Sequence, residues 1–214
     1  MTTNDRSTAL ITALGATDAS QRLRAALAAG TAADERLVPV LIERCGTEPD
    51  FFVRDMLTWA LCRASADITV PALLTELESA HPQARSQALH TLSKIGERRA
   101  FSRVAMSIHD PDDDVARAAW RAAVALVDPA DASDLAADLA AEFGRGDAQV
   151  RLSLARAMVE LGDSAHPVVD VYVHHADPRV GAHAAATERL LSDPDAAFDL
   201  SVEMARRASV GVDV

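Results

Sequence analysis

The sequence is short of lysine, of cysteine and of aromatic residues, and each shortage excludes a class of protein. Lys94 is the only lysine, and 32 acidic residues outnumber 21 basic ones to give a net charge of −11. Binding to duplex nucleic acid needs clustered cations that displace counterions, so we expect no direct contact with nucleic acid. An acidic chain suits a protein partner instead, and we expect that partner to be basic or helical.

The two cysteines, Cys45 and Cys62, are too few for a disulfide framework or a cysteine zinc site. Both lie on apolar helical stripes, where we expect them to be small buried hydrophobic residues. Aromatic residues make up only 4% of the chain while alanine is abundant. This balance favours closely packed helices over β-sandwiches or barrels.

The sequence also shows no pattern typical of a signal peptide or of a membrane-spanning helix. The stretch MTTNDRSTALITALGA has no basic n-region and no long apolar run, and no later segment approaches the length of a membrane span. The sequence therefore predicts a cytoplasmic protein with no membrane partner.

What is present is an internal repeat of about thirty-one residues. A marker residue precedes each alanine-rich segment, at Asp18, Asp50, His81, Asp112, Asp147 and Asp177. Mostly apolar residues follow three and seven positions after each marker, which is the spacing of one buried helical face. Three prolines, Pro39, Pro71 and Pro167, come later in their units. We expect each to lie in the first turn of a second helix, where its missing N–H loses no hydrogen bond.

Each unit is therefore predicted to be a hairpin of two antiparallel helices. One hairpin cannot bury its apolar face alone, so neighbouring hairpins must stack. We predict an all-α fold, a right-handed α-solenoid of about six hairpins that forms one domain over residues 1–214. A capping helix at 4–14 precedes hairpins at about 18–45, 50–79, 82–108, 112–143, 147–175 and 177–208, and the last hairpin includes a helix at 194–208.

Three segments carry a resemblance to a known family. DPDDDVARAAWRAAVAL, GDAQVRLSLARAMVELGD and PQARSQALHTLSKIGE resemble HEAT repeats of the short class associated with phycobilisome lyases. In that class an aspartate opens the first helix and a Val-Arg pair follows, and the matching arginines here are Arg22, Arg54, Arg85 and Arg151, with Arg117 shifted and Gly181 in the sixth unit. FFVRDMLTWALCR resembles small actinobacterial HEAT-repeat proteins of unassigned role. We expect these arginines to form structural ladders that bridge successive units.

The acidic stretch DPDDD at 110–114 has two interpretations. Asp110, Asp112 and Asp114 fit the start of an EF-hand loop, but Val115 stands where that loop needs glycine and Arg121 where it needs a bidentate glutamate. An aspartate here also suits an N-cap, with further carboxylates at the positive end of the helix dipole. The sequence therefore predicts a turn and not a calcium site.

No cofactor or metal is expected from the histidines. His166, Asp170 and His174 share one face of a predicted helix, with His183 as a donor from the next helix. The first and last of the three are separated by about 12 Å of helical rise, too far to bind one ion. We therefore predict no metal site.

Catalytic patterns are equally weak. HEAT-like DNA glycosylases use aromatic residues and an aspartate, and Trp59, Trp120 and Asp55 are residues of these types. The net negative charge of the chain instead favours tryptophans that fill gaps between helices. No nucleophile elbow, phosphate-binding loop or dinucleotide fingerprint occurs. We expect a protein that is not an enzyme.

The remaining candidate is a surface. The HEAT resemblance implies that second helices line the inner, concave side, and their outward positions are Arg44, Glu76, Arg103, Asp134, Asp138, Asp170, His174 and Glu203. We predict a protein–protein interaction scaffold or adaptor that binds its partner there. The same row can equally be an ordinary solvated face.

Two alternatives stay open. The first is a bilin lyase-like chaperone or enzyme accessory, which would need an apolar or aromatic trough with arginines, and only Tyr172 and Arg103 hint at one. The second is a regulatory module associated with a MerR-like DNA-binding protein.

Overall fold

The computed structural model describes residues 3–193, and within that range every regular element is a helix. The chain divides into two compact units, Met1–Val127 and Asp128–Val214, which we call unit 1 and unit 2. The predicted all-α fold built from helical hairpins is confirmed. The prediction of one continuous solenoid through both units stays a prediction.

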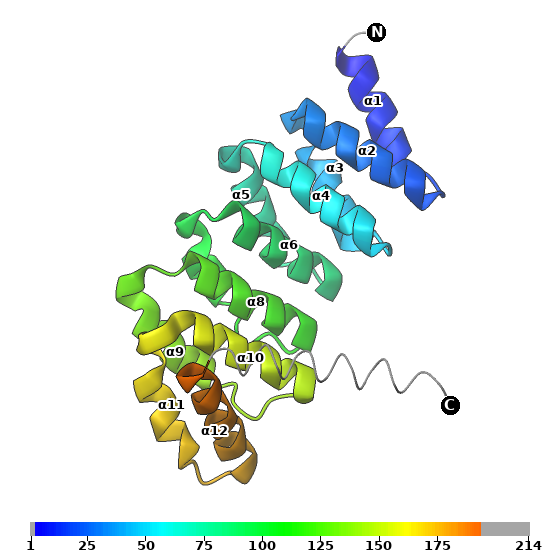
Figure 1. Cartoon of the computed structure of the whole chain (residues 1–214). Helices are drawn as coiled ribbons and strands as arrows, with labels where there is room; N and C mark the ends of the chain where they lie inside the picture. The colour runs from blue at the N-terminus through cyan, green and yellow to red at the C-terminus, as the bar shows by residue number, and fades with distance from the viewer. Residues whose placement is uncertain (1–2, 194–214) are drawn as a thin grey trace, which may run out of the picture. The chain divides into compact units, whose positions relative to one another are not determined.

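Unit 1 consists of stacked hairpins behind an N-terminal helix. Its α-helices are α1 (Thr3–Leu14), α2 (Ala19–Ala32), α3 (Val38–Thr47), α4 (Phe51–Arg63), α5 (Ala66–Glu76), α6 (Pro82–Ile95), α7 (Phe101–Ala105) and α8 (Asp113–Leu126). Figure 1 shows α2, α4, α6 and α8 side by side, and contacts run from each to the next. Among the second helices, α3 contacts α4, α5 and α6, α5 contacts α6, and α7 contacts α8.

Unit 2 repeats the arrangement with two second helices and two first helices. They are α9 (Ala132–Ala140), α10 (Ala148–Leu161), α11 (His166–Val173) and α12 (Pro178–Ser192). Helix α12 packs against both α10 and α11, and α9 contacts α10 and α11. The second helix predicted at 194–208 lies outside the described residues.

Aspartate caps explain where the first helices begin. The carboxylates of Asp18, Asp50, Asp112, Asp147 and Asp177 each accept a hydrogen bond from an amide two or three residues further on. These bonds satisfy amides that have no partner inside the helix. The acidic stretch at 110–114 is therefore a turn, as predicted, with Asp112 as the cap of α8.

Alanine allows the helices to approach closely, and large side chains fill the spaces that remain. Trp120 is fully buried, and its indole N–H donates to the carbonyl oxygen of Ile108 over 3.0 Å. Trp59 covers Gly30, where a Cβ atom would lie 2.3 Å from the ring. Both tryptophans therefore fill gaps between helices, which confirms the structural interpretation of these residues.

Three details differ from the sequence prediction. Pro71 lies inside α5 and not in its first turn, because α5 already begins after Ser65, whereas Pro39 and Pro167 do lie in first turns. Several second helices begin with a short 3₁₀ segment, and α7, the second helix of the hairpin predicted at 82–108, has only 5 residues. Cys62 is exposed, so the expectation that both cysteines are buried is wrong for Cys62 and right for Cys45.

None of the helices in the described part of the chain has the length and apolar character needed to cross a membrane.

Candidate partner-binding surfaces

The arginines of the Val-Arg pattern hold the loops between repeats. Arg22, Arg54, Arg85 and Arg151 each donate a hydrogen bond to one or two backbone carbonyls five or six residues earlier. Two of them also reach forward to a carboxylate before the next first helix, namely Arg22 to Glu48 and Arg85 to Asp110. The expected structural ladder is confirmed for Arg22 and Arg85, which bridge successive hairpins, whereas Arg54 and Arg151 hold only the loop before their own helix.

Glu48 is the most buried charge in this ladder, with a side chain 0% exposed. Its carboxylate accepts two hydrogen bonds from Arg22, both of 2.7 Å, one from Arg44 and one from the amide of Asp50. Burial acts to raise the pKa of Glu48, but the hydrogen bonds from Arg22, Asp50 and Arg44 outweigh it and leave the pKa lowered. Glu48 therefore stays ionised inside unit 1 as a structural anion.

A groove in unit 1 crosses three successive first helices. It has a volume of about 520 Å³, and its lining residues come from α4, α6 and α8. Counted from the N-cap, α6 and α8 both contribute the residues at positions 2, 5, 6 and 9, which are Gln83, Ser86, Gln87 and His90 on α6 and Asp114, Arg117, Ala118 and Arg121 on α8. We name this surface the mixed-charge groove, because Arg54, Lys94, Arg117 and Arg121 line it together with Asp55, Asp112 and Asp114.

In the mixed-charge groove, two cations lie near one histidine, His90. Burial lowers the pKa of His90, and the charges of Lys94 and Arg121 lower it further, while Asp55 acts in the opposite direction. The ring is therefore held in its neutral form beside two cations. Phe51, which also lines this groove, is 66% exposed and meets Phe52, 71% exposed, edge to face.

A second groove lies in unit 2 between α10 and α12. It has a volume of about 700 Å³, and its lining residues are Gly144, Ala148, Arg151, Leu152, Arg179, Ala182, His183, Ala186, Arg189 and Leu190. We name it the arginine-rimmed groove. On α12 the lining residues again stand 2, 5, 6 and 9 positions after the N-cap, so the two grooves use equivalent places in the repeat.

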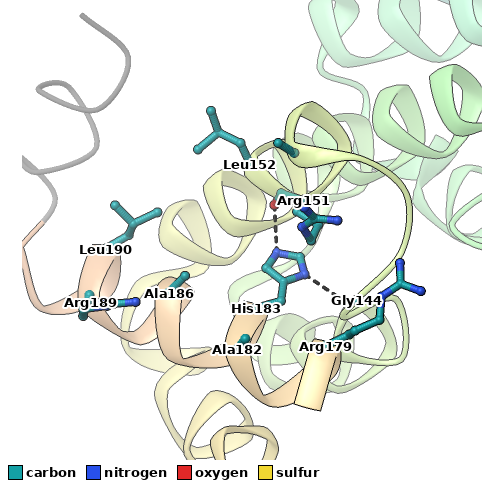
Figure 2. A pocket seen from close by; sticks show the side chains of 10 residues that line it. Gly144, Arg151, Leu152, Arg179, Ala182, His183, Ala186, Arg189 and Leu190 are labelled. Carbon is teal, nitrogen blue, oxygen red and sulfur yellow. Dashed lines mark hydrogen bonds between the residues drawn. The ribbon is translucent and has the colours of Figure 1, made fainter. Parts of the chain in front are cut away.

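His183 forms part of the wall of the arginine-rimmed groove and is held by backbone atoms on both sides (Figure 2). Its Nδ1 accepts from the amide of Gly144 over 3.0 Å, so Nε2 carries the proton and donates to the carbonyl of Arg151 over 2.8 Å. Burial lowers the pKa of His183 to about 4, only partly offset by that carbonyl. The imidazole is therefore a neutral structural bridge between α10 and α12.

The residues predicted for the partner-binding row fall in several environments. In unit 1, Arg44 is drawn into the Glu48 cluster, Arg103 pairs with Glu78 at 2.6 Å, and Glu76 is half-buried at the end of α5. In unit 2, Asp134 and Asp138 are exposed on α9.

The structure brings together Asp170 and His174, which line one cavity of about 580 Å³ with Val171, Val173 and Glu188. Glu203 lies outside the described residues. The two grooves on the first helices were not predicted from the sequence.

The metal candidates do not assemble in the part of the chain that the structure describes. No group of three or more His, Cys, Asp or Glu side chains there is placed to hold a metal ion. His183 has both ring nitrogens committed to backbone atoms, so it offers no lone pair to a metal bound by His166 or His174.

Comparison with known proteins gives one family match and several distant structural likenesses. Residues 53–126 match the family model of HEAT repeats. Two crystal structures of engineered proteins are similar, one at 18% identity over 88% of this chain and 97% of that chain with a TM-score of 0.45, the other at 16% over 88% and 98% with a TM-score of 0.47.

The complex of CpcE and CpcF of phycocyanin lyase from Nostoc sp. PCC7120 is similar at 18% identity, over 85% of this chain and 75% of that chain, with a TM-score of 0.49. No curated protein sequence matches. These structural likenesses are too distant to assign a function, but the family match covers hairpins that the structure shows in unit 1. Residues 53–126 therefore carry HEAT repeats, in the all-α part of the chain that unit 1 describes.

Proposed function

We propose that the chain is a non-enzymatic scaffold that binds a protein partner across successive HEAT repeats. The observation that carries this proposal is the mixed-charge groove, where α6 and α8 present side chains from the same repeat positions and α4 adds Phe51, Arg54 and Asp55. Three repeats thus contribute to one surface, as a partner in extended or helical form requires.

The chemistry of the mixed-charge groove favours a protein over a small substrate. Its lining alternates cations, carboxylates and amides, and Arg117 pairs with Asp114 at 3.3 Å. Hydrogen-bonding groups of both signs fit a polypeptide, whose backbone and side chains offer both donors and acceptors. Phe51 in the lining and its neighbour Phe52, both exposed, supply apolar anchors of the kind that dominate many interfaces.

The second helices of unit 1 offer a competing surface. Arg44 and Arg103 there are engaged with Glu48 and Glu78, so their charges are already partly neutralised within the chain. We keep the predicted row of second-helix residues as a proposal, with the first-helix groove as the leading surface.

Affinity capture with matched variants tests the proposal. The wild-type chain is compared with a groove variant, Lys94→Glu with Arg121→Glu, and a second-helix variant, Glu76→Lys with Arg103→Glu. We expect one dominant protein with the wild type, its loss with the groove variant and its retention with the second-helix variant. Circular dichroism of each variant checks the fold. If both variants capture the same proteins as wild type, the proposal fails.

One observation favours a second function, the handling of a pigment. That role needs an apolar trough with arginines, and the arginine-rimmed groove has Leu152 and Leu190 beside three arginines. Visible absorbance of the protein purified from its native cell tests this alternative. A stoichiometric chromophore would support it, and a colourless protein would count against it.

A further inference from the structure

The arginine-rimmed groove carries charge of only one sign. Among the residues that the structure describes, its lining includes Arg151, Arg179 and Arg189 and no aspartate or glutamate, on a chain whose net charge is −11. Over residues 3–193, none of these three arginines forms an ion pair with a carboxylate. Arg151 donates to the carbonyl of Gly146 over 2.6 Å and Arg189 to that of Ala185 over 3.2 Å. These bonds leave their charges uncompensated, which favours an anionic occupant.

Between the arginines the groove is apolar. Leu152, Ala182, Ala186 and Leu190 line it, and Leu190 is 5% exposed. His183 adds no unmet hydrogen bond, because both of its ring nitrogens are bonded to backbone atoms. The floor of the groove therefore favours apolar side chains.

The spacing of the arginines sets the length of the occupant. Arg179 and Arg189 stand ten residues apart on α12, which corresponds to about 15 Å along the helix. In Figure 2, Arg151 and Arg179 lie at the His183 end, while Arg189 and Leu190 lie at the other end. A compact ligand with a single acidic group would reach one end only. A helix of about three turns with carboxylates at both ends would reach both.

We infer that the arginine-rimmed groove binds an acidic amphipathic helix of a protein partner. This inference rests on the proposed scaffold function and names the chemistry of one partner segment. The helix lays leucine-like side chains along Ala182, Ala186 and Leu190. Its carboxylates meet Arg151 and Arg179 at one end and Arg189 at the other.

Titration of the full chain with two synthetic helical peptides tests the inference. Both peptides carry the same leucine stripe, and one has glutamates near both ends where the other has lysines. Fluorescence anisotropy of labelled peptide reports binding. We expect the glutamate peptide to bind at least about tenfold more tightly than the lysine peptide, with an affinity that falls as salt is raised.

Matched variants show whether binding occurs in this groove. Arg189→Glu should weaken binding of the glutamate peptide at least about tenfold. Arg156→Glu, at an exposed position of α10 outside the groove, should leave it unchanged. Equal binding of both peptides, or equal effects of both variants, would overturn the inference.

Other occupants give distinguishable results. If a segment of the same chain fills the groove, hydrogen exchange at Ala186–Leu190 will be slow in the free protein and unchanged by peptide, which also counts against the inference. If the glutamate peptide does not bind but a partner is still captured through the mixed-charge groove, the inference fails and the proposed function stands. Failure of the capture experiment would defeat the proposed function.

Discussion

The two grooves occupy equivalent places in the repeat and differ in the carboxylates and apolar side chains that line them. In unit 1 the residues 2, 5 and 9 positions after the cap of α8 are Asp114, Arg117 and Arg121. In unit 2 the same positions on α12 hold Arg179, Ala182 and Ala186. The fold determines where a groove forms, and the side chains at these few positions determine what it can bind.

The arginines that hold the loops between repeats also differ in their hydrogen-bond partners. Arg22 and Arg85 in unit 1 are paired with carboxylates, whereas Arg54 in unit 1 and Arg151 in unit 2 donate to backbone carbonyls. The charge of an arginine paired with a carboxylate is neutralised within the chain, so Arg22 and Arg85 serve the stability of unit 1. The charge of Arg151 is not neutralised by a carboxylate of the described residues, and Arg151 lines the arginine-rimmed groove.

The largest expected effect comes from breaking the clamp in unit 1. Glu48→Ala leaves the guanidinium of Arg22 buried without its carboxylate, and we expect a loss of about 3–5 kcal/mol in the free energy of unfolding. Arg151→Ala removes one hydrogen bond to a carbonyl and should cost about 1 kcal/mol. Urea denaturation followed by circular dichroism measures both. Equal losses would contradict the contrast between the units.

A pH effect should distinguish unit 2. Folding lowers the pKa of His183 from 6.5 to about 4, so the folded state favours the neutral ring. The associated stability is fully present above pH 6.5 and is lost as the pH falls towards 4. From pH 7 to pH 5 we expect a loss of about 2 kcal/mol in the free energy of unfolding.

His183→Gln should remove most of that pH dependence, because glutamine does not titrate. His90→Gln in unit 1 is the matched control, since His90 is only half-buried, and its effect on the slope should be smaller. Urea midpoints at several pH values report the result. A slope that survives in His183→Gln would show that other groups cause the loss.

Exchanging one groove residue between the units should weaken peptide binding only when the change is made in unit 2. Arg179→Asp gives α12 the charge that α8 has at Asp114, and we expect binding of the glutamate peptide to weaken about tenfold. The reciprocal Asp114→Arg, in unit 1, should leave that binding unchanged. Anisotropy titrations of both variants make the measurement. Similar effects of the two variants would show that the peptide does not bind specifically in unit 2.

The smallest effect is expected on the second helices. Arg103 and Glu78 form an ion pair whose side chains are 46% and 72% exposed. Arg103→Ala should therefore change the free energy of unfolding by less than about 1 kcal/mol, as exposed ion pairs do. A larger loss in urea denaturation would give this pair a structural role comparable to that of Glu48.

The parts of the fold that sequence could predict are those set by local spacing. The cap at Asp112, the helix start marked by Asp147 and the start of the hairpin at 82 were foreseen, because a cap and an apolar stripe depend on residues within a few turns. Pro71 was misplaced, because its helix begins earlier than proline preference alone suggests. Cys62 was wrongly expected to be buried, because its stripe faces solvent at that end of α4.

The candidate sites depend on contacts between distant repeats, and the sequence predicted them poorly. Glu48 looks like an ordinary surface acid until Arg22, 26 residues away, meets it in the folded chain. The signal for the arginine-rimmed groove was present, since Ala182, Ala186 and Leu190 recur every four residues on a face where sister helices carry polar side chains. It was hidden because small apolar residues occur on every face of these helices.

Hydrogen exchange of the full chain with and without the glutamate peptide tests the central claim most directly, that side chains at equivalent repeat positions select the partner. We expect added protection at residues 148–152 and 179–190, and none in α4, α6 or α8. Protection spread over both grooves, or confined to unit 1, would contradict the claim.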